Sequence, residues 1–200
     1  MNISREEMRK NLQKEFEQCY LSVPKTHSPD IEGVVILSHV DYNFDREDPR
    51  CKFSDELISR IEYGAKMFLD SSLKVFLIMD GCRSQLLLME ERAIGLGVRQ
   101  DQIYLLDAGD IAFSNTKKQI EILRDDPITS KMKKIVFITN TYHVPRVRRT
   151  ASLLIPENIS FDVFGVPNDI SLYDKQNAIN GEIERILKYI EKGDIAITPR

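Results

Sequence analysis

The chain has 200 residues, of which 42% are hydrophobic and 30% charged. This is an ordinary globular composition, with enough residues to bury a core without disulfides or structural metals. The net charge of −3 excludes a global basic field of the kind that holds nucleic acid. The N-terminus is charged and no apolar run reaches transmembrane length, so we expect a cytoplasmic protein that makes no membrane contact.

The N-terminal segment is predicted to form an amphipathic helix. Ser4 to Glu7 fits a capping box, and apolar residues then recur every four positions to about Gln18. Residues 23–29 are predicted to form a linker. We therefore divide the chain into a helix and linker over 1–24 and a single domain over 30–197. The apolar stripe predicts packing either on that domain or on a second copy in a homodimer.

Buried strands alternate with helices along the rest of the chain. Strands are expected over 34–37, 75–79, 103–106, 135–138 and 161–166. Helices are expected after Ser54, after Ser84, over 112–124, from the turn after the fourth strand to about Leu154, and over 179–190. The fifth strand alternates in polarity, which is typical of an edge strand. Helical crossovers between strands predict a three-layer α/β/α Rossmann-like (HUP-like) domain with a mainly parallel five-stranded sheet and an added N-terminal helix.

The segment from Lys134 to Arg149 is the most informative part of the sequence. A buried strand is followed by a polar turn and by Pro145, which suits the first turn of a helix. His143 and Arg146 are three residues apart, so both side chains share one helical face. A guanidinium beside an imidazole at a helix start predicts a site for an anionic ligand. The next two arginines, 148 and 149, are interpreted as solvated helix surface.

Polar residues follow each predicted strand, at the edge where open α/β sheets bind ligands. The predicted ligand-binding residues at this edge are Ser38, His39, Asp41, Asp80, Gly81, Asn115, Thr116, Thr139, Asn140 and Thr141. Helix capping is an equal alternative for the pair at 115–116 and for residues 139–141. For Asp80 the alternative is a structural ion pair with Arg60 or Arg83.

No metal site or cysteine nucleophile is predicted. His39 and the acids from Asp41 to Asp48 lie in one long polar loop, and such a loop is more often solvated than built as a cation site. The three cysteines form no Cys-x-x-Cys pair, so the sequence indicates neither a zinc site nor a disulfide framework. Cys82 lies near the same edge but lacks a Cys-His-acid pattern.

The stretch from Thr139 to Arg146 resembles the T-s-x-y-H-x-x-R motif of the YdcF-like family, a family of unknown function that includes SanA and ElyC. Weaker matches follow in the family's order over residues 33–168: Arg60 with Ala65, Asp80-Gly81, Gly97-Val98 and Asn115-Thr116. The resemblance implies a Rossmann-like fold and, for some members, S-adenosylmethionine binding. Ser38-His39-Val40 replaces a glycine-rich turn, and Gln85 and Lys118 replace acids. These departures favour a divergent member with a different or more anionic ligand.

Three functional hypotheses follow. The leading one is a cytoplasmic enzyme that acts on a phosphorylated or nucleotide-like small molecule by hydrolysis or group transfer, in which Arg146 clamps the anion and His143 moves a proton. The alternative is a non-catalytic binding or sensor module for an adenosine-containing ligand such as S-adenosylmethionine. The third is an interaction protein that docks through its N-terminal helix.

Overall fold

The computed structural model describes residues 4–21, 30–38, 54–71, 76–109, 115–166 and 172–200. Five strands form one parallel sheet in the order β3-β2-β1-β4-β5: β1 (Gly33–Leu37), β2 (Phe76–Gly81), β3 (Ile103–Asp107), β4 (Lys134–Asn140) and β5 (Ser160–Val166). The predicted fold class is confirmed, and β5 is an edge strand as expected. Strands β2 and β3 are added on one side of β1, and β4 and β5 on the other. The point where strand order reverses therefore lies between β1 and β4.

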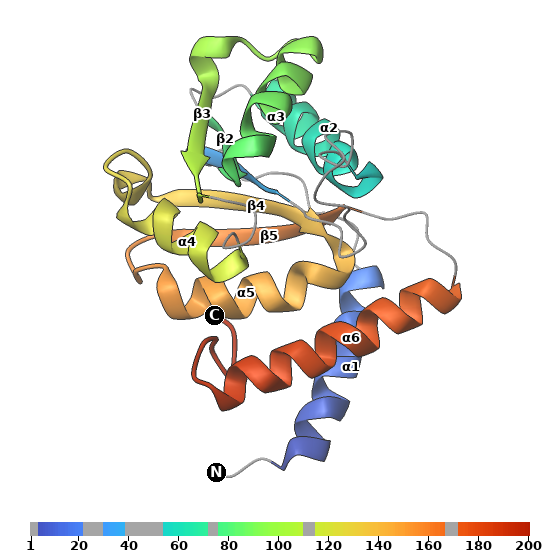
Figure 1. Cartoon of the computed structure of the whole chain (residues 1–200). Helices are drawn as coiled ribbons and strands as arrows, with labels where there is room; N and C mark the ends of the chain where they lie inside the picture. Colours follow the sequence, from blue (N-terminus) through green and yellow to red (C-terminus); the bar gives the residue numbers. More distant parts are fainter. Residues whose placement is uncertain (1–3, 22–29, 39–53, 72–75, 110–114, 167–171) are drawn as a thin grey trace.

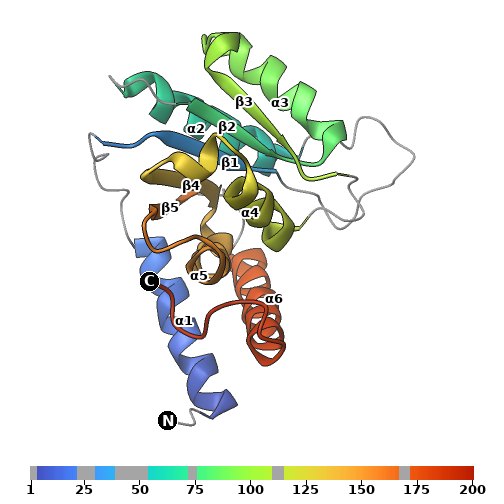
Figure 2. The same cartoon turned by 90° about the vertical axis from the view of Figure 1, so that its left-hand side faces the viewer.

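Helices cover both faces of the sheet (Figures 1 and 2). Helices α2 (Asp55–Asp70) and α3 (Arg83–Gly95) pack on one face, and α4 (Thr116–Asp125) and α5 (Val144–Leu154) pack on the other. Helices α1 (Arg5–Leu21) and α6 (Leu172–Glu191) lie beyond α5. Among the described helices, none combines the length and the apolar character needed to cross a membrane.

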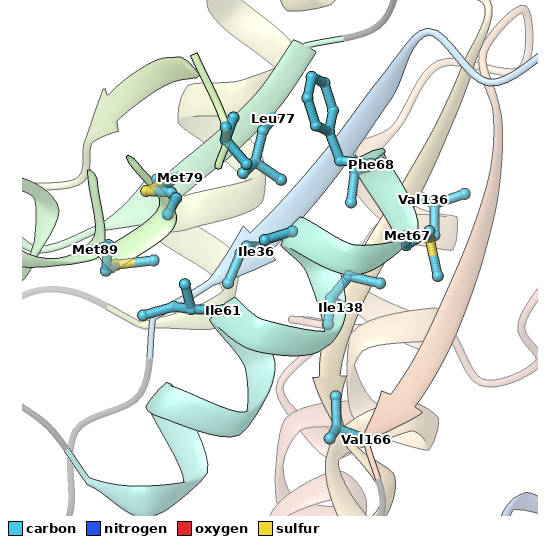
Figure 3. Packing of buried hydrophobic residues seen from close by; sticks show 14 of the residues in the cluster. Ile36, Ile61, Met67, Phe68, Leu77, Met79, Met89, Val136, Ile138 and Val166 are labelled. Atoms are coloured by element: carbon cyan, nitrogen blue, oxygen red, sulfur yellow. The ribbon is translucent and has the colours of Figure 1, made fainter. Parts of the chain in front are cut away.

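The core on the α2–α3 side shows why these strands are apolar throughout. Ile36 of β1 and Ile138 of β4 pack against Ile61 and Phe68 of α2, and each is at most 4% exposed (Figure 3). Helices on both sides exclude water from both faces of the central strands, so these strands read as continuous apolar runs. Helix α2 begins as predicted, because the Ser54 hydroxyl accepts a hydrogen bond from the Leu57 N–H at 3.2 Å.

The N-terminal helix packs on its own chain. Leu12 and Phe16 are buried against Ile183 and Ile186 of α6. An ion pair adds to this docking: both terminal nitrogens of Arg149 donate to the Glu15 carboxylate, at 2.8 and 2.7 Å. Arg149 is 6% exposed, so its interpretation as solvated surface is wrong. The sequence missed this because the partner lies 134 residues away.

Some element boundaries also differ from the predictions. Thr139 and Asn140 belong to β4 rather than to a turn, because β5 continues to pair with them and Asn140 lies opposite Val166. Helix α4 begins at Thr116, not at 112; residues 110–114 lie outside the described ranges. Residues 23–29, predicted as a linker, also lie outside them.

We expect Gly165→Ala to destabilise the fold by about 1–3 kcal/mol, since overpacking forces the backbone or its neighbours to shift. A Cβ at Gly165 would lie 2.6 Å from the Thr141 Cα, in the turn that leads to His143. The matched control is Gly181→Ala in α6, where a Cβ meets nothing within 4 Å. That change should stabilise by about 0.5–1 kcal/mol through helix propensity. Urea unfolding measures both; equal effects of the two changes would contradict the close contact.

Candidate functional site

The carboxyl ends of β1 and β2 are tied together by a side chain of α4. The Ser38 N–H donates to the Asp80 carbonyl at 2.8 Å. The Gln119 amide donates to that same carbonyl at 2.8 Å and to the Ser38 hydroxyl at 3.0 Å. Gly81 lies so close to Ser38 that a Cβ would clash with it. Three predicted residues are thus adjacent, whereas His39 and Asp41 lie outside the described residues. Gln119 was not predicted.

Arg60 of α2 joins β1 to β4 at the reversal of strand order. Its guanidinium is 1% exposed, and it donates to the Leu37 carbonyl at 2.9 Å, to the Ser38 carbonyl at 3.2 Å and to the Asn140 side-chain oxygen. Burial lowers the pKa of Arg60 to about 10, so the group stays charged at neutral pH. The edge therefore contains one buried positive charge bound to strand termini.

His143 and Arg146 lie in contact, as their spacing predicts. Residues Thr141–His143 form a 3-10 turn that leads into α5, with Pro145 in its first turn. The Arg146 Nη2 contacts His143 Nε2, its Nη1 donates to the Thr116 hydroxyl at 2.8 Å, and its Nε donates to Glu182 at 2.7 Å. Glu182, from α6, was missed by sequence reasoning. Each guanidinium nitrogen of Arg146 thus has a partner, and an anion would have to compete with Glu182.

Burial and neighbouring charge set the protonation of this cluster. The Glu182 side chain is 1% exposed and also accepts from Arg185 at 2.5 Å. Although its burial opposes ionisation, the adjacent Arg146 guanidinium lowers the pKa of Glu182. Burial and the adjacent Arg146 lower the pKa of His143 to about 3. The imidazole is therefore neutral at pH 7, and because Arg146 donates toward Nε2, that nitrogen acts as an acceptor.

Two predicted residues have buried polar atoms that no partner satisfies. In the part of the chain that the structure describes, neither carboxylate oxygen of Asp80 nor the hydroxyl of Thr139 has a hydrogen-bond partner. Both residues are 0% exposed, and burial raises the pKa of Asp80 well above its usual value. The proposed structural partners of Asp80 bond elsewhere, Arg60 as described and Arg83 to Asp107 at 2.6 Å.

Asp80 and Thr139 face the same side of the sheet. Ile78 and Phe137, two residues before each of them, are buried in the core on the α4–α5 side. Because side chains alternate along a strand, Asp80 and Thr139 also point to that side. Strand β1 lies between them, and Leu37 is the direct neighbour of Asp80. The unsatisfied groups therefore lie on one face, on strands that flank β1.

A separate hollow of about 160 Å³ adjoins Arg146, with Asn115, Thr116 and Lys117 of the α4 start and the segment after α6 in its wall. A partly exposed ion pair joins Lys117 to Asp194 at 2.6 Å. The Asn115 side chain accepts from the Lys118 N–H at 3.0 Å, which matches the helix-capping alternative for this residue. Three predicted residues thus line one hollow, one of them as a cap.

The remaining reactive groups of the described segments do not assemble into a second centre. No group of three His, Cys, Asp or Glu side chains within the described ranges is arranged to hold a metal ion. Cys82 is buried and its thiol contacts the Gln85 side-chain oxygen at 3.2 Å. That contact involves an amide rather than a base.

Comparison of the chain with protein-family models, with curated proteins and with solved structures found no match. The resemblance to the YdcF-like family therefore stays a prediction from motifs. The function has to be argued from the chemistry of the site.

We expect the free energy of unfolding of His143→Gln to fall less with decreasing pH than that of the wild-type protein. A folded-state pKa of about 3, below the unfolded value of 6.5, means that the neutral imidazole stabilises the fold above pH 6.5. This contribution is lost as the pH falls from 6.5 through 3, by up to about 1.4 kcal/mol per pH unit. Wild type should therefore lose stability more steeply than the variant over that window.

Urea unfolding of both proteins at pH 7, 6, 5 and 4 gives the difference in slope. Carboxylates that do not contact His143 cancel in this difference, and Glu17→Gln on the exposed face of α1 serves as the control variant. Parallel curves for wild type and His143→Gln would mean that the imidazole is not held neutral.

Proposed function

We propose that this protein binds a phosphorylated or nucleotide-like small molecule at the carboxyl edge of its sheet, beside the reversal of strand order between β1 and β4. Hydrolysis or group transfer is the associated chemistry. The observation that carries the proposal is the pair of buried, unsatisfied groups, the Asp80 carboxyl and the Thr139 hydroxyl, within the described residues. Ligands of open α/β sheets bind at this edge.

The energetic cost of these groups supports a ligand. A buried polar group without a partner costs about 1–3 kcal/mol, and an ionised one costs more. Native proteins retain few such groups, and each calls for a partner such as a water, ion or ligand. The combined cost of two such groups, on one face and on strands that flank β1, is an appreciable fraction of the free energy of unfolding of a domain. A ligand that hydrogen-bonds to both would offset that cost.

The surrounding charges suit a ligand that carries phosphate. Arg60 and Arg146 contribute positive charge beside the edge, and Glu182 balances part of it. The Thr139 hydroxyl can donate to a phosphate oxygen, and the Asp80 carboxyl is left for another polar group of the ligand. In an enzymatic reaction His143 moves the proton and Arg146 orients its imidazole. The anion contact is then assigned to the neighbouring strands rather than to Arg146, because the nitrogens of Arg146 already contact Glu182, Thr116 and His143.

A second candidate is a non-catalytic module for an adenosine-containing ligand such as S-adenosylmethionine. The low pKa of His143 favours it, because an imidazole with a pKa of about 3 is a weak base. The two candidates share a binding site and differ in turnover. Incubation with each ligand followed by mass spectrometry separates them: a new product supports the enzyme, and an unchanged bound ligand supports the module.

We expect a ligand of this class to raise the melting temperature of the wild-type protein. Ligand at about 100 times its Kd adds about 2.7 kcal/mol, equivalent to roughly 5–10 °C for a domain of this size. The probes are AMP, S-adenosylmethionine and ribose 5-phosphate, in a thermal-shift assay. Thr139→Val should reduce the shift, whereas Asp107→Asn, at the exposed end of β3, should keep it. If no probe moves the melting temperature, the proposal is wrong.

We expect Asp80→Asn to change the pH dependence of stability in the free protein. A raised folded-state pKa means that the folded state holds a proton that the unfolded state releases, so wild type loses stability as the pH rises above about 3.8. The loss is up to about 1.4 kcal/mol per pH unit until the folded-state pKa is reached. The asparagine variant lacks this titration, so its free energy of unfolding should increase relative to that of wild type as the pH rises from 4 to 8. Urea unfolding over that range is the measurement; a constant difference would show that Asp80 does not titrate above its usual value.

A further inference from the structure

We infer that Asp80 recognises two neighbouring hydroxyl groups of the ligand, such as the 2′- and 3′-hydroxyls of ribose. The inference rests on the proposed function and narrows it: among phosphorylated and nucleotide-like molecules, it selects those that contain a ribonucleoside. Three observations carry it: the place of Asp80 in the sheet, the state of its two oxygens, and the use that the other carboxylates at this edge already have.

The first observation is position. Asp80 is the second-last residue of β2, and β2 is the direct neighbour of β1 in a sheet of order β3-β2-β1-β4-β5. Dinucleotide-binding sheets share this order, and in them an acidic residue near the end of the second strand binds ribose hydroxyls. Asp80 also lies one residue from the edge at which the ligand is proposed to enter. Its placement therefore suits the sugar rather than the phosphate.

The second observation is hydrogen-bonding capacity. Both Asp80 oxygens lack partners within the described part of the chain, and the residue is fully buried. A carboxylate accepts through both oxygens, so two adjacent hydroxyl donors satisfy it completely. A phosphate has no such donors when ionised and would be repelled by an ionised Asp80. A diol thus fits the ionised carboxylate, and the phosphate fits the cationic side of the site.

The third observation is that the other carboxylates among the described residues of this edge, Asp107, Glu182 and Glu56, are already engaged. Asp107 accepts from Arg83 and from the Gly109 N–H. Glu182 accepts from Arg146 and Arg185, and Glu56 accepts from the Tyr142 hydroxyl at 2.6 Å. These groups have their positions fixed by protein partners. Within the described residues, Gln119 and Ser38 bind the backbone of Asp80, and its carboxyl group has no partner.

The inference has a consequence for protons. In the free protein burial keeps the Asp80 proton in place, because an ionised carboxylate without partners is costly there. Two hydroxyl donors stabilise the ionised form instead, so binding releases up to one proton to the buffer. Recognition of a phosphate by protonated Asp80 would release none from this residue.

The experiment compares AMP with 2′,3′-dideoxy-AMP by isothermal titration calorimetry at pH 6. We expect the dideoxy ligand to bind about ten- to a hundred-fold more weakly, the range for a lost hydrogen bond to a charged group. The phosphate of both ligands titrates near pH 6, so proton release from Asp80 is read from the difference between them. We expect the binding enthalpy of AMP to depend more strongly on the ionisation enthalpy of the buffer than that of the dideoxy ligand, in two buffers that contain no phosphate. The same titrations on Asp80→Asn should show a much smaller preference for AMP and the same buffer dependence for both ligands, while Asp107→Asn should behave as wild type.

The outcomes separate the two proposals. Equal affinity of the wild-type protein for AMP and dideoxy-AMP would overturn the role of Asp80 and leave nucleotide binding intact. Binding of ribose 5-phosphate or S-adenosylmethionine without AMP calls for the same comparison with the 2′,3′-dideoxy form of that ligand. Failure of every probe would remove both proposals. Because the comparison of ligands uses wild-type protein, the result does not depend on whether Asp80→Asn folds.

Discussion

The buried carboxylate of Glu182 determines how the last helix meets the rest of the domain. It lies among Arg146, Arg185 and His143, and almost none of it is exposed. Removing one partner from a buried pair costs about 3–5 kcal/mol, because the remaining charge is left in a medium that solvates it poorly. The position of α6 is therefore linked to the turn after β4, and through Arg146 to the start of α4. The imidazole, the guanidinium and the helix start form one connected unit.

This connection divides the carboxyl edge into two parts with different electrostatics. Around Arg146 and Glu182, opposite charges lie in direct contact, which gives the region a fixed geometry and little net charge. Around Asp80 and Thr139 the polar atoms lie on apolar strands without partners among the described residues. Low polarity strengthens every interaction made there, whether with a ligand or with an added charge. The region around Arg146 and Glu182 therefore fixes the local structure, and the region around Asp80 and Thr139 has the unsatisfied groups that a ligand can bind.

Much of the fold could be predicted from the sequence because it depends on local periodicity. Continuous apolar runs such as Val34 to Leu37 predict buried strands, and helical connections between successive strands predict parallel pairing. The contact of His143 with Arg146 is equally local, since three residues on a helix fix it. The partners of these two residues come from elsewhere in the chain. Glu182 reaches Arg146 only after α6 has docked, so no spacing in the sequence encodes that contact.

Sequence signals for the missed residues nevertheless exist. Glu182 falls inside an apolar stripe, between Ile179 and Ile183, where a solvated glutamate is not expected. Arg60 falls in the same way between Leu57 and Ile61 of α2. A charge in the middle of a buried stripe indicates an internal pair, though not the identity of its partner. Conversely, the sequence gives no sign that Asp80 lacks a partner, because Arg60 and Arg83 were equally plausible ones.

The pairing of α1 with α6 has a consequence for synthesis on the ribosome. Leu12 and Phe16 are made well before the isoleucines that cover them, 183 and 186. Until then α1 lacks its apolar contact with α6, and closing a loop of this length is entropically costly. The nascent chain therefore carries a partly uncovered apolar helix face until α6 has been made, which makes α1 a natural point of contact for a chaperone.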